Sequence, residues 1–101
     1  MKKLSSMYTH IVSFKVKDGE GITFIELQQF EELTEAKPAG LDHFHIFKDR
    51  NEDNRYFLIE YWNSKKDKDK MEASKEHQLF HEHRKAIIEK KYDTYECDVI
   101  I

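Results

Sequence analysis

The chain has 101 residues, 37% of them charged and 39% hydrophobic, a length and composition that suit one folded domain with a single core. Its formal net charge of −3 argues against a nucleic-acid surface, because neutralising phosphates needs clustered positive charge. No apolar run approaches the roughly 18 residues of a membrane span, and no apolar segment follows the basic start, as a signal peptide would require. A single cysteine, Cys97, cannot form a disulfide within the chain, so we expect a reducing compartment and a cytoplasmic protein.

Hydrophobic periodicity predicts the secondary structure. In chain order we expect a strand over 7–17, a helix over 22–36, strands over 41–48 and 55–62, a short charged helix from 64 to 70 or 71, a helix over 74–90, and a strand from 92 or 95 to 101. This order predicts one α+β domain over 1–101, with its core over about 7–100. The expected fold is ferredoxin-like βαββαβ, an antiparallel sheet with helices on one face.

The predicted strand over 55–62 is apolar on both faces. The residues of the two faces are Tyr56, Leu58 and Trp62, and Phe57, Ile59 and Tyr61. Helices can cover one of these faces, and leaving the other in water would cost about 25 cal/mol per Å² of apolar surface. We therefore expect a homodimer packed sheet to sheet with twofold symmetry. A large apolar ligand or a different protein partner is the alternative.

Three segments of the chain resemble the antibiotic biosynthesis monooxygenase (ABM) domain, and the likeness runs from about Met7 to Ile100. The segments are 8–19 (YTHIVSFKVKDG), 49–62 (DRNEDNRYFLIEYW) and 74–80 (SKEHQLF). Their more distinctive parts are Glu60-x-Trp62 and the helix start Ser74-x-x-His77-x-x-Phe80. The resemblance implies a dimeric α+β barrel of two ferredoxin-like subunits, each with a pocket between its sheet and its helices.

The activities that the resemblance implies are diverse. The family includes cofactor-free monooxygenases that oxidise quinols or anthrones, haem-degrading oxygenases, and isomerases of small phosphorylated signals; a similar stress-responsive barrel family often has no known reaction. The Asn, Trp and His of the haem-degrading members fall here on Val12, Met71 and His81, so only the histidine is kept, and haem binding through His81 stays an alternative. In the anthrone-oxidising members an Asn lies four residues before a Trp, where this chain has Leu58 before Trp62.

Cofactor-free oxygenation needs a base that removes an O–H or C–H proton, a donor for the resulting oxyanion, and an apolar lining. Histidine suits the base, because its ordinary pKa of about 6.5 lies near working pH. His77 and His81 are four residues apart and share one helix face, which either lines the pocket or faces water. His10 lies on the strand face that the family turns toward its pocket, and it is the third candidate for a catalytic residue.

We expect the substrate to contact an apolar wall. Trp62 and Phe14 are the main candidates for this wall, although an aromatic strand residue such as Trp62 is also a common core residue. Val12, Met71 and Leu58 occupy the positions to which the resemblance assigns site residues, and we expect them to contact the substrate as well.

Further polar residues allow two structural expectations. His83 shares an apolar helix stripe with Leu79, Phe80, Ala86 and Ile87, which predicts a packed, hydrogen-bonded core histidine. Glu60 shares the strand face of Trp62 and would be costly to bury alone, so Arg84 or a residue of a second chain is expected to pair with it.

The spacing His77-x-x-x-His81 would let two imidazoles share a metal ion, but we can place no third ligand and predict no metal site. The leading hypothesis is a homodimeric monooxygenase-like protein that acts without a cofactor on a small aromatic or quinol-like molecule. The alternatives are a non-enzymatic barrel that binds a small ligand, and a haem-binding protein with His81 as axial ligand.

Overall fold

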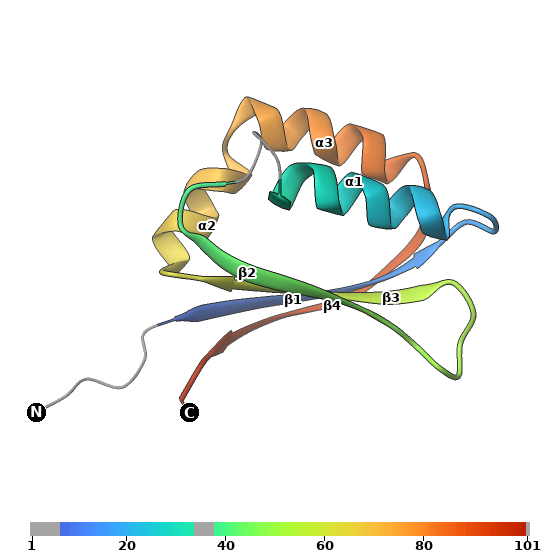
Figure 1. The fold of residues 1–101 in the computed structure, drawn as a ribbon, viewed down its shortest axis with the longest axis horizontal. Coiled ribbons are helices and arrows are strands. Elements are labelled where there is room, and N and C mark those ends of the chain that lie inside the picture. The colour runs from blue at the N-terminus through green and yellow to red at the C-terminus, as the bar shows by residue number, and fades with distance from the viewer. Residues whose placement is uncertain (1–6, 34–37, 101) are drawn as a thin grey trace, which may run out of the picture.

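A computed structural model describes residues 7–33 and 38–100, and its element order confirms the predicted fold (Figure 1). The elements are β1 (Tyr8–Val16), α1 (Gly21–Leu33), β2 (Leu41–Lys48), β3 (Arg55–Trp62), α2 (Lys65–Glu72), α3 (Lys75–Lys85) and β4 (Ile88–Asp98). The last residues of the predicted first helix, 34–36, and Ile101 of the predicted last strand lie outside the described residues.

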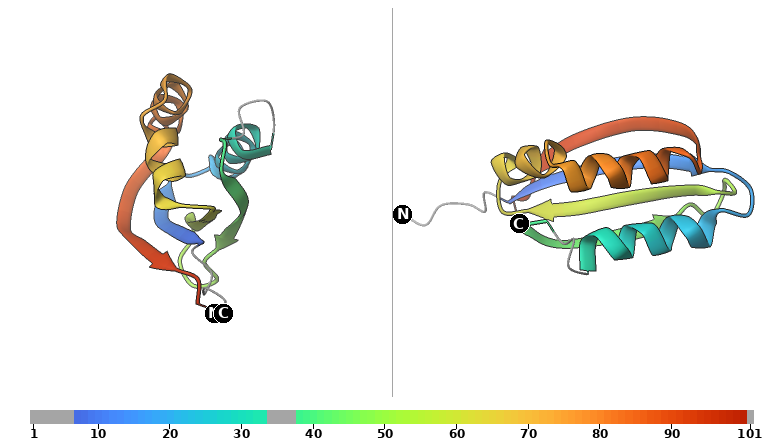
Figure 2. Two further views of the ribbon diagram at one scale, coloured as in Figure 1. Left: turned by 90° about the vertical axis from the view of Figure 1, so that its left-hand side faces the viewer. Right: turned by 90° about the horizontal axis from the view of Figure 1, so that it is seen from above.

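The strands form one antiparallel sheet in the order β2-β3-β1-β4. All the described helices lie on one face of this sheet, and α3 runs over β1 while α1 runs over β2 (Figure 2). β1 and β3 are the central strands, and they supply most of the buried apolar side chains.

The larger hydrophobic core lies between α1 and the sheet. Phe24 of α1 is fully buried, and its ring centroid lies 5.7 Å from that of Phe14 and 5.3 Å from that of Tyr56. A smaller cluster, against which Met71 of α2 packs, consists of Tyr8, Leu41 and Trp62. The two clusters together hold both the long helix α1 and the short helix α2 on the sheet.

The second long helix is shorter than the sequence predicts. α3 ends at Lys85 rather than near Lys90, and β4 begins at Ile88. Lys90 pairs instead with Lys15 of β1. Neither Gly nor Pro lies in this segment to end a helix, so the change to a strand depends on pairing with a distant part of the chain.

The predicted buried stripe of Leu79, Phe80, His83, Ala86 and Ile87 is correct for Phe80 and wrong for Leu79, His83 and Ala86. Leu79 is 66% exposed and His83 is exposed, whereas Phe80 is only 8% exposed. The free energy gained by burial scales with apolar area, so a helix with few apolar residues turns its largest one inward. Because one residue corresponds to about 100° of rotation, burying Phe80 leaves Leu79 facing outward.

The pairing of β4 with β1 contains two register shifts, one between Val12 and Phe14 and one between Lys15 and Val16. Val12 pairs with Thr94, but Phe14 pairs with Lys91, so β4 has one residue more than β1 over this stretch. Such a bulge bends the strand and changes the face to which the following side chains point. Lys91 therefore lies on the helix-covered face with Phe14. Tyr92 packs instead against Arg55, whose guanidinium carbon lies 4.1 Å from the ring centroid.

The face opposite the helices is uncovered in a single chain, as the apolar pattern of β3 predicts. Its larger side chains are Ile11, His43, His45, Phe47, Phe57, Ile59, Tyr61 and Tyr95. Phe47 is 51% exposed and Tyr95 is 55% exposed. The ring of His43 stacks on that of Tyr61 with centroids 4.0 Å apart, which gives this face a flat aromatic surface.

Candidate functional site

A cavity of about 370 Å³ lies between the inner face of the sheet and helices α2 and α3. Its lining residues are His10, Val12, Leu58, Glu60, Lys68, Met71, Glu72, His77, His81, Arg84, Lys91, Thr94 and Glu96. The volume falls in the usual range for small-molecule sites, about 300–1,000 Å³. Among the predicted site residues, it brings together His10, Val12, Leu58, Met71, His77 and His81.

A larger hollow of about 690 Å³ opens between α1 and α3, and its lining includes Phe30 and Leu79. It shares Met71 and His77 with the first cavity but contains neither His10 nor His81. The smaller cavity is therefore the candidate site, because it alone of the two combines bases from the sheet and the helix.

Serine caps fix the start of both helices above the cavity. Ser64 Oγ accepts a hydrogen bond from the backbone N–H of Asp67 at 3.1 Å, and Ser74 Oγ accepts one from the backbone N–H of His77 at 3.1 Å. Each cap satisfies a backbone donor that the helix itself cannot. The Ser74 cap fixes the helical turn that carries His77 and therefore the helix face that it shares with His81.

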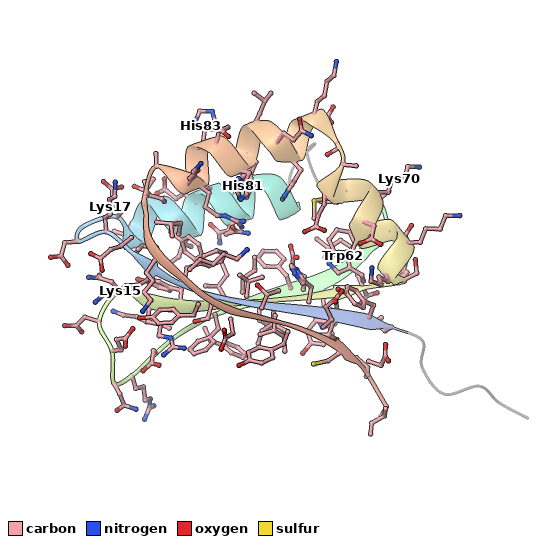
Figure 3. The ribbon with its side chains drawn as sticks, turned by 180° about the vertical axis from the view of Figure 1, so that it is seen from behind. Lys15, Lys17, Trp62, Lys70, His81 and His83 are labelled. Atoms are coloured by element: carbon pink, nitrogen blue, oxygen red, sulfur yellow. The ribbon has the colours of Figure 1, made fainter. Side chains whose placement is uncertain are left out.

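The imidazole of His81 is positioned on the side of α3 that faces the sheet, whereas His83 points away from it (Figure 3). The ring centroids of His77 and His81 are 6.0 Å apart. His81 is exposed to solvent at its outer side, yet desolvation by the surrounding protein lowers its pKa, and the positive charge of Arg84, the neighbouring His77 and the charge of Lys91 lower it further. His81 is therefore held in its neutral form at neutral pH, the form that accepts a proton.

A second histidine contributes to the cavity from the sheet. His10 on β1 pairs with Glu60 on β3, and its Nδ1 lies 3.4 Å from Glu60 Oε1. Both side chains are largely buried, with 11% of His10 and 6% of Glu60 exposed. A carboxylate beside Nδ1 selects the tautomer and the orientation of the ring. The sequence predicted Arg84 or a residue of a second chain as the partner of Glu60, and the contact described here is with His10 instead.

Two of the predicted wall residues do not line the cavity. Trp62 is fully buried with Tyr8 and Leu41, and Phe14 is 2% exposed within the larger core. The apolar part of the cavity wall is formed instead by Val12, Leu58 and Met71. Trp62 and Phe14 lie behind this wall and support it.

Hydrogen bonds and ion pairs hold the charged lining residues in place. Tyr8 donates its hydroxyl hydrogen to Glu96 Oε1 at 2.5 Å, and this bond is the main reason that the pKa of Glu96 is lowered. Lys68 Nζ lies 2.7 Å from Glu72 Oε1. Arg84 Nη1 donates to Gln28 Oε1 of α1 at 2.8 Å, which links the two long helices above the sheet.

Sequence reasoning missed several lining residues: Lys68, Glu72, Lys91, Thr94 and Glu96. Lys68 belongs to an alternating charged run that resembles a solvated helix, yet it is only 7% exposed. The last three belong to β4, and only the pairing with β1 shows which side of the sheet they face. From the sequence, these three β4 residues could have been found only by comparing alternative registers of β4 against β1.

Within residues 7–33 and 38–100, no group of three or more His, Cys, Asp or Glu side chains is arranged to hold a metal ion. No helix in this described part is long and apolar enough to cross a membrane.

A family model for antibiotic biosynthesis monooxygenases matches residues 7–83. The chain belongs to this family. The match covers β1 through most of α3 and therefore every element of the candidate site except β4.

Solved structures share the fold of this ABM domain over nearly its whole length. A protein from Nitrosomonas europaea that carries the family's name aligns with a TM-score of 0.82 at 16% identity, covering 99% of this chain and 96% of that one. SnoaB from Streptomyces nogalater, a cofactor-independent oxygenase, aligns with a TM-score of 0.79 at 16% identity, covering 93% of each chain. A conserved protein from Methanosarcina mazei aligns with a TM-score of 0.80 at 12% identity, covering 93% of each chain. No curated protein sequence matches. At these identities the likeness shows the fold alone.

Proposed function

We propose that this ABM domain is a cofactor-independent monooxygenase that oxidises a small aromatic or quinol-like molecule with O₂. The observation that carries the proposal is the position of His81, an imidazole of lowered pKa, on a cavity whose wall includes the apolar side chains of Val12 and Leu58. A neutral base next to an apolar surface is what proton removal from an activated arene requires.

In this reaction the imidazole of His81 removes a proton from an activated CH₂ group of the substrate, and the carbanion gives one electron to O₂. The substrate radical and superoxide combine to form a C–O bond, and the peroxide takes its proton from the imidazolium. Loss of water then leaves a carbonyl, so that CH₂ and O₂ become C=O and H₂O. The substrate supplies every electron, and His77, beside His81, is the proposed donor to the anion.

The alternative of haem held by His81 finds less support in the lining. A macrocycle needs broad apolar walls, but three carboxylates face the cavity, those of Glu60, Glu72 and Glu96. Each of the three has a partner within the fold, but Glu72 and Glu96 are also exposed to water, and an apolar macrocycle would remove that hydration at a cost. The residues present therefore do not fit haem well, although His81 itself would be a competent ligand.

We also propose that the chain works as a homodimer through the uncovered sheet face. The half-buried side chains of Phe57, Ile59 and Tyr61 on that face would be removed from water by a second sheet. Cys97 is a free, exposed thiol, which supports a reducing compartment such as the cytoplasm. Light scattering at micromolar concentration should give the mass of a dimer, and a monomer would contradict the arrangement.

The test of the proposed activity is oxygen uptake by metal-free protein with a panel of anthrones and hydroquinones. We expect His81→Gln to lower the rate at least tenfold, about 1.4 kcal/mol of barrier. His83→Gln is the matched control, because His83 lies on the same helix and is exposed as His81 is, but does not line the cavity. The acidic limb of kcat/KM should have its midpoint below pH 6.5, because the pKa of His81 is lowered.

An unchanged rate in His81→Gln would refute the role of His81 and direct the same test to His77 and then His10. Absence of uptake over the whole panel, together with thermal protection by an aromatic ligand, would favour the non-enzymatic binding protein instead.

A further inference from the structure

The candidate cavity is electrically asymmetric along β1. At one end, His10 pairs with Glu60 on one side and with Glu96 on the other, which places two carboxylates beside it. At the other end, Phe14 pairs with Lys91, and the guanidinium carbon of Arg84 lies 4.7 Å from the Phe14 ring centroid. His10 and Phe14 are four residues apart, a distance on the order of 13 Å along a strand.

The acidic end is largely neutralised by the protein itself. Glu96 accepts the hydroxyl hydrogen of Tyr8, and Glu60 contacts Nδ1 of His10. The carboxylates at this end therefore have donors within the fold and do not require a cationic ligand.

Lys91, at the other end, differs in this respect. Among the described side chains, no ion pair includes Lys91, although Lys91 lines the cavity. Arg84 is fixed in position, because it donates to Gln28 and its guanidinium carbon lies 5.1 Å from the ring centroid of Phe80. His81 lies three residues before Arg84 on α3 and so shares its side of the helix, and both line the cavity together with Lys91.

We propose that the end of the cavity formed by Arg84 and Lys91 binds a carboxylate of the substrate, so that the substrate class is a small aromatic acid. That this ligand is a substrate rests on the proposed oxygenase function. That the cavity binds a carboxylate does not depend on that function. The ring would lie against Val12 and Leu58, with its oxidisable carbon or hydroxyl near His81.

The chemistry of the two cations suits this ligand. A guanidinium held in place loses little freedom on binding, and its planar donors match a carboxylate. Lys91 comes from a different element and adds a second charge, so a neutral analogue of the same size would forfeit both interactions. The selectivity for acid over ester is therefore the direct measure of this subsite.

The experiment measures binding without turnover, by anaerobic calorimetry with 2,5-dihydroxybenzoate and with its methyl ester. We expect the acid to bind at least tenfold more tightly than the ester to the unaltered protein. Lys91→Gln should reduce this preference for the acid several-fold. Raising the salt concentration should reduce the preference that remains in the variant still further. Lys90→Gln is the control, since Lys90 is the preceding residue of β4, pairs with Lys15 and does not line the cavity.

Equal binding of acid and ester, or the same loss in Lys90→Gln as in Lys91→Gln, would overturn the proposal. Lys91 is exposed, so its replacement is not expected to unfold the protein, and circular dichroism of each variant checks this. Oxygen uptake separates the two proposals: uptake with neutral hydroquinones and no preference for the acid refutes only the subsite. Preference for the acid without uptake on any substrate refutes only the oxygenase activity.

Discussion

Replacement of Phe24 by alanine tests whether one aromatic ring of α1 holds this helix on the sheet. Phe24 is fully buried between Phe14 and Tyr56. A buried phenylalanine removes about 200 Å² from water, which at about 25 cal/mol per Å² corresponds to about 5 kcal/mol. Alanine retains its β-carbon, so we expect a loss of about 4 kcal/mol in the free energy of unfolding, within the range measured for such truncations.

The assay is urea denaturation followed by circular dichroism at one fixed protein concentration, because association also contributes to apparent stability. With a slope of about 1.5 kcal/mol per M, a loss of about 4 kcal/mol moves the midpoint down by about 2.5 M. Domains of this size have only about 5–15 kcal/mol in total, so the variant should be close to unfolding. Ile22→Ala is the matched control on the same helix, because Ile22 is 73% exposed.

A midpoint shift in Phe24→Ala no larger than that in Ile22→Ala would refute the reasoning. It would mean that the ring of Phe24 is not enclosed between α1 and the sheet, and the placement of α1 would then be wrong. A change in slope rather than midpoint would indicate instead that the variant unfolds through a different state.

Two further predictions concern the support of the site. In Tyr8→Phe the pKa of Glu96 should rise toward its ordinary 4.5, measured by NMR titration of the carboxyl carbon, because the hydrogen bond from Tyr8 is the first cause of the lowered value. A lowered pKa stabilises the fold above pH 4.5 and loses this contribution as pH falls through the lowered value, so the variant should show a weaker acid dependence of stability. Ser74→Ala should lower the free energy of unfolding in urea by about 1 kcal/mol, because it removes the cap on α3. Ser74→Asp should retain most of the stability, because aspartate also caps helices; equal losses in the two variants would contradict the capping role.

The strands and their order along the chain were predictable because their signals are local. The alternation of apolar residues in β1 and β3 identifies strands, and the apolar positions on both faces of β3 identify an uncovered surface. The boundary between α3 and β4 was not predictable in this way. Residues Ala86 and Ile87 suit a helix, and only the backbone pairing of Ile88 with Val16 of β1 makes this segment a strand.

The candidate site was predictable only in part, for a similar reason. The spacing of His77 and His81 fixes their common helix face, and the alternation of β1 brings His10 to the same side of the sheet. Gln28 could not be found, because a polar residue on an amphipathic helix ordinarily faces water, and its burial depends on the bond from Arg84 in a different helix. Trp62 was left open between wall and core, and its complete burial places it in the core.

The bulge between β1 and β4 suggests how the ligand preference of this cavity could change between related proteins. A regular ladder continuing from the Val12–Thr94 pair would put Tyr92 opposite Phe14, and the inserted residue puts Lys91 there instead. Because neighbouring strand residues point to opposite faces, gain or loss of one residue in an edge strand exchanges a phenol for an ammonium group at the end of the cavity. An insertion or deletion at this place would thus alter ligand preference in one step, without a substitution in the core and without changing the fold.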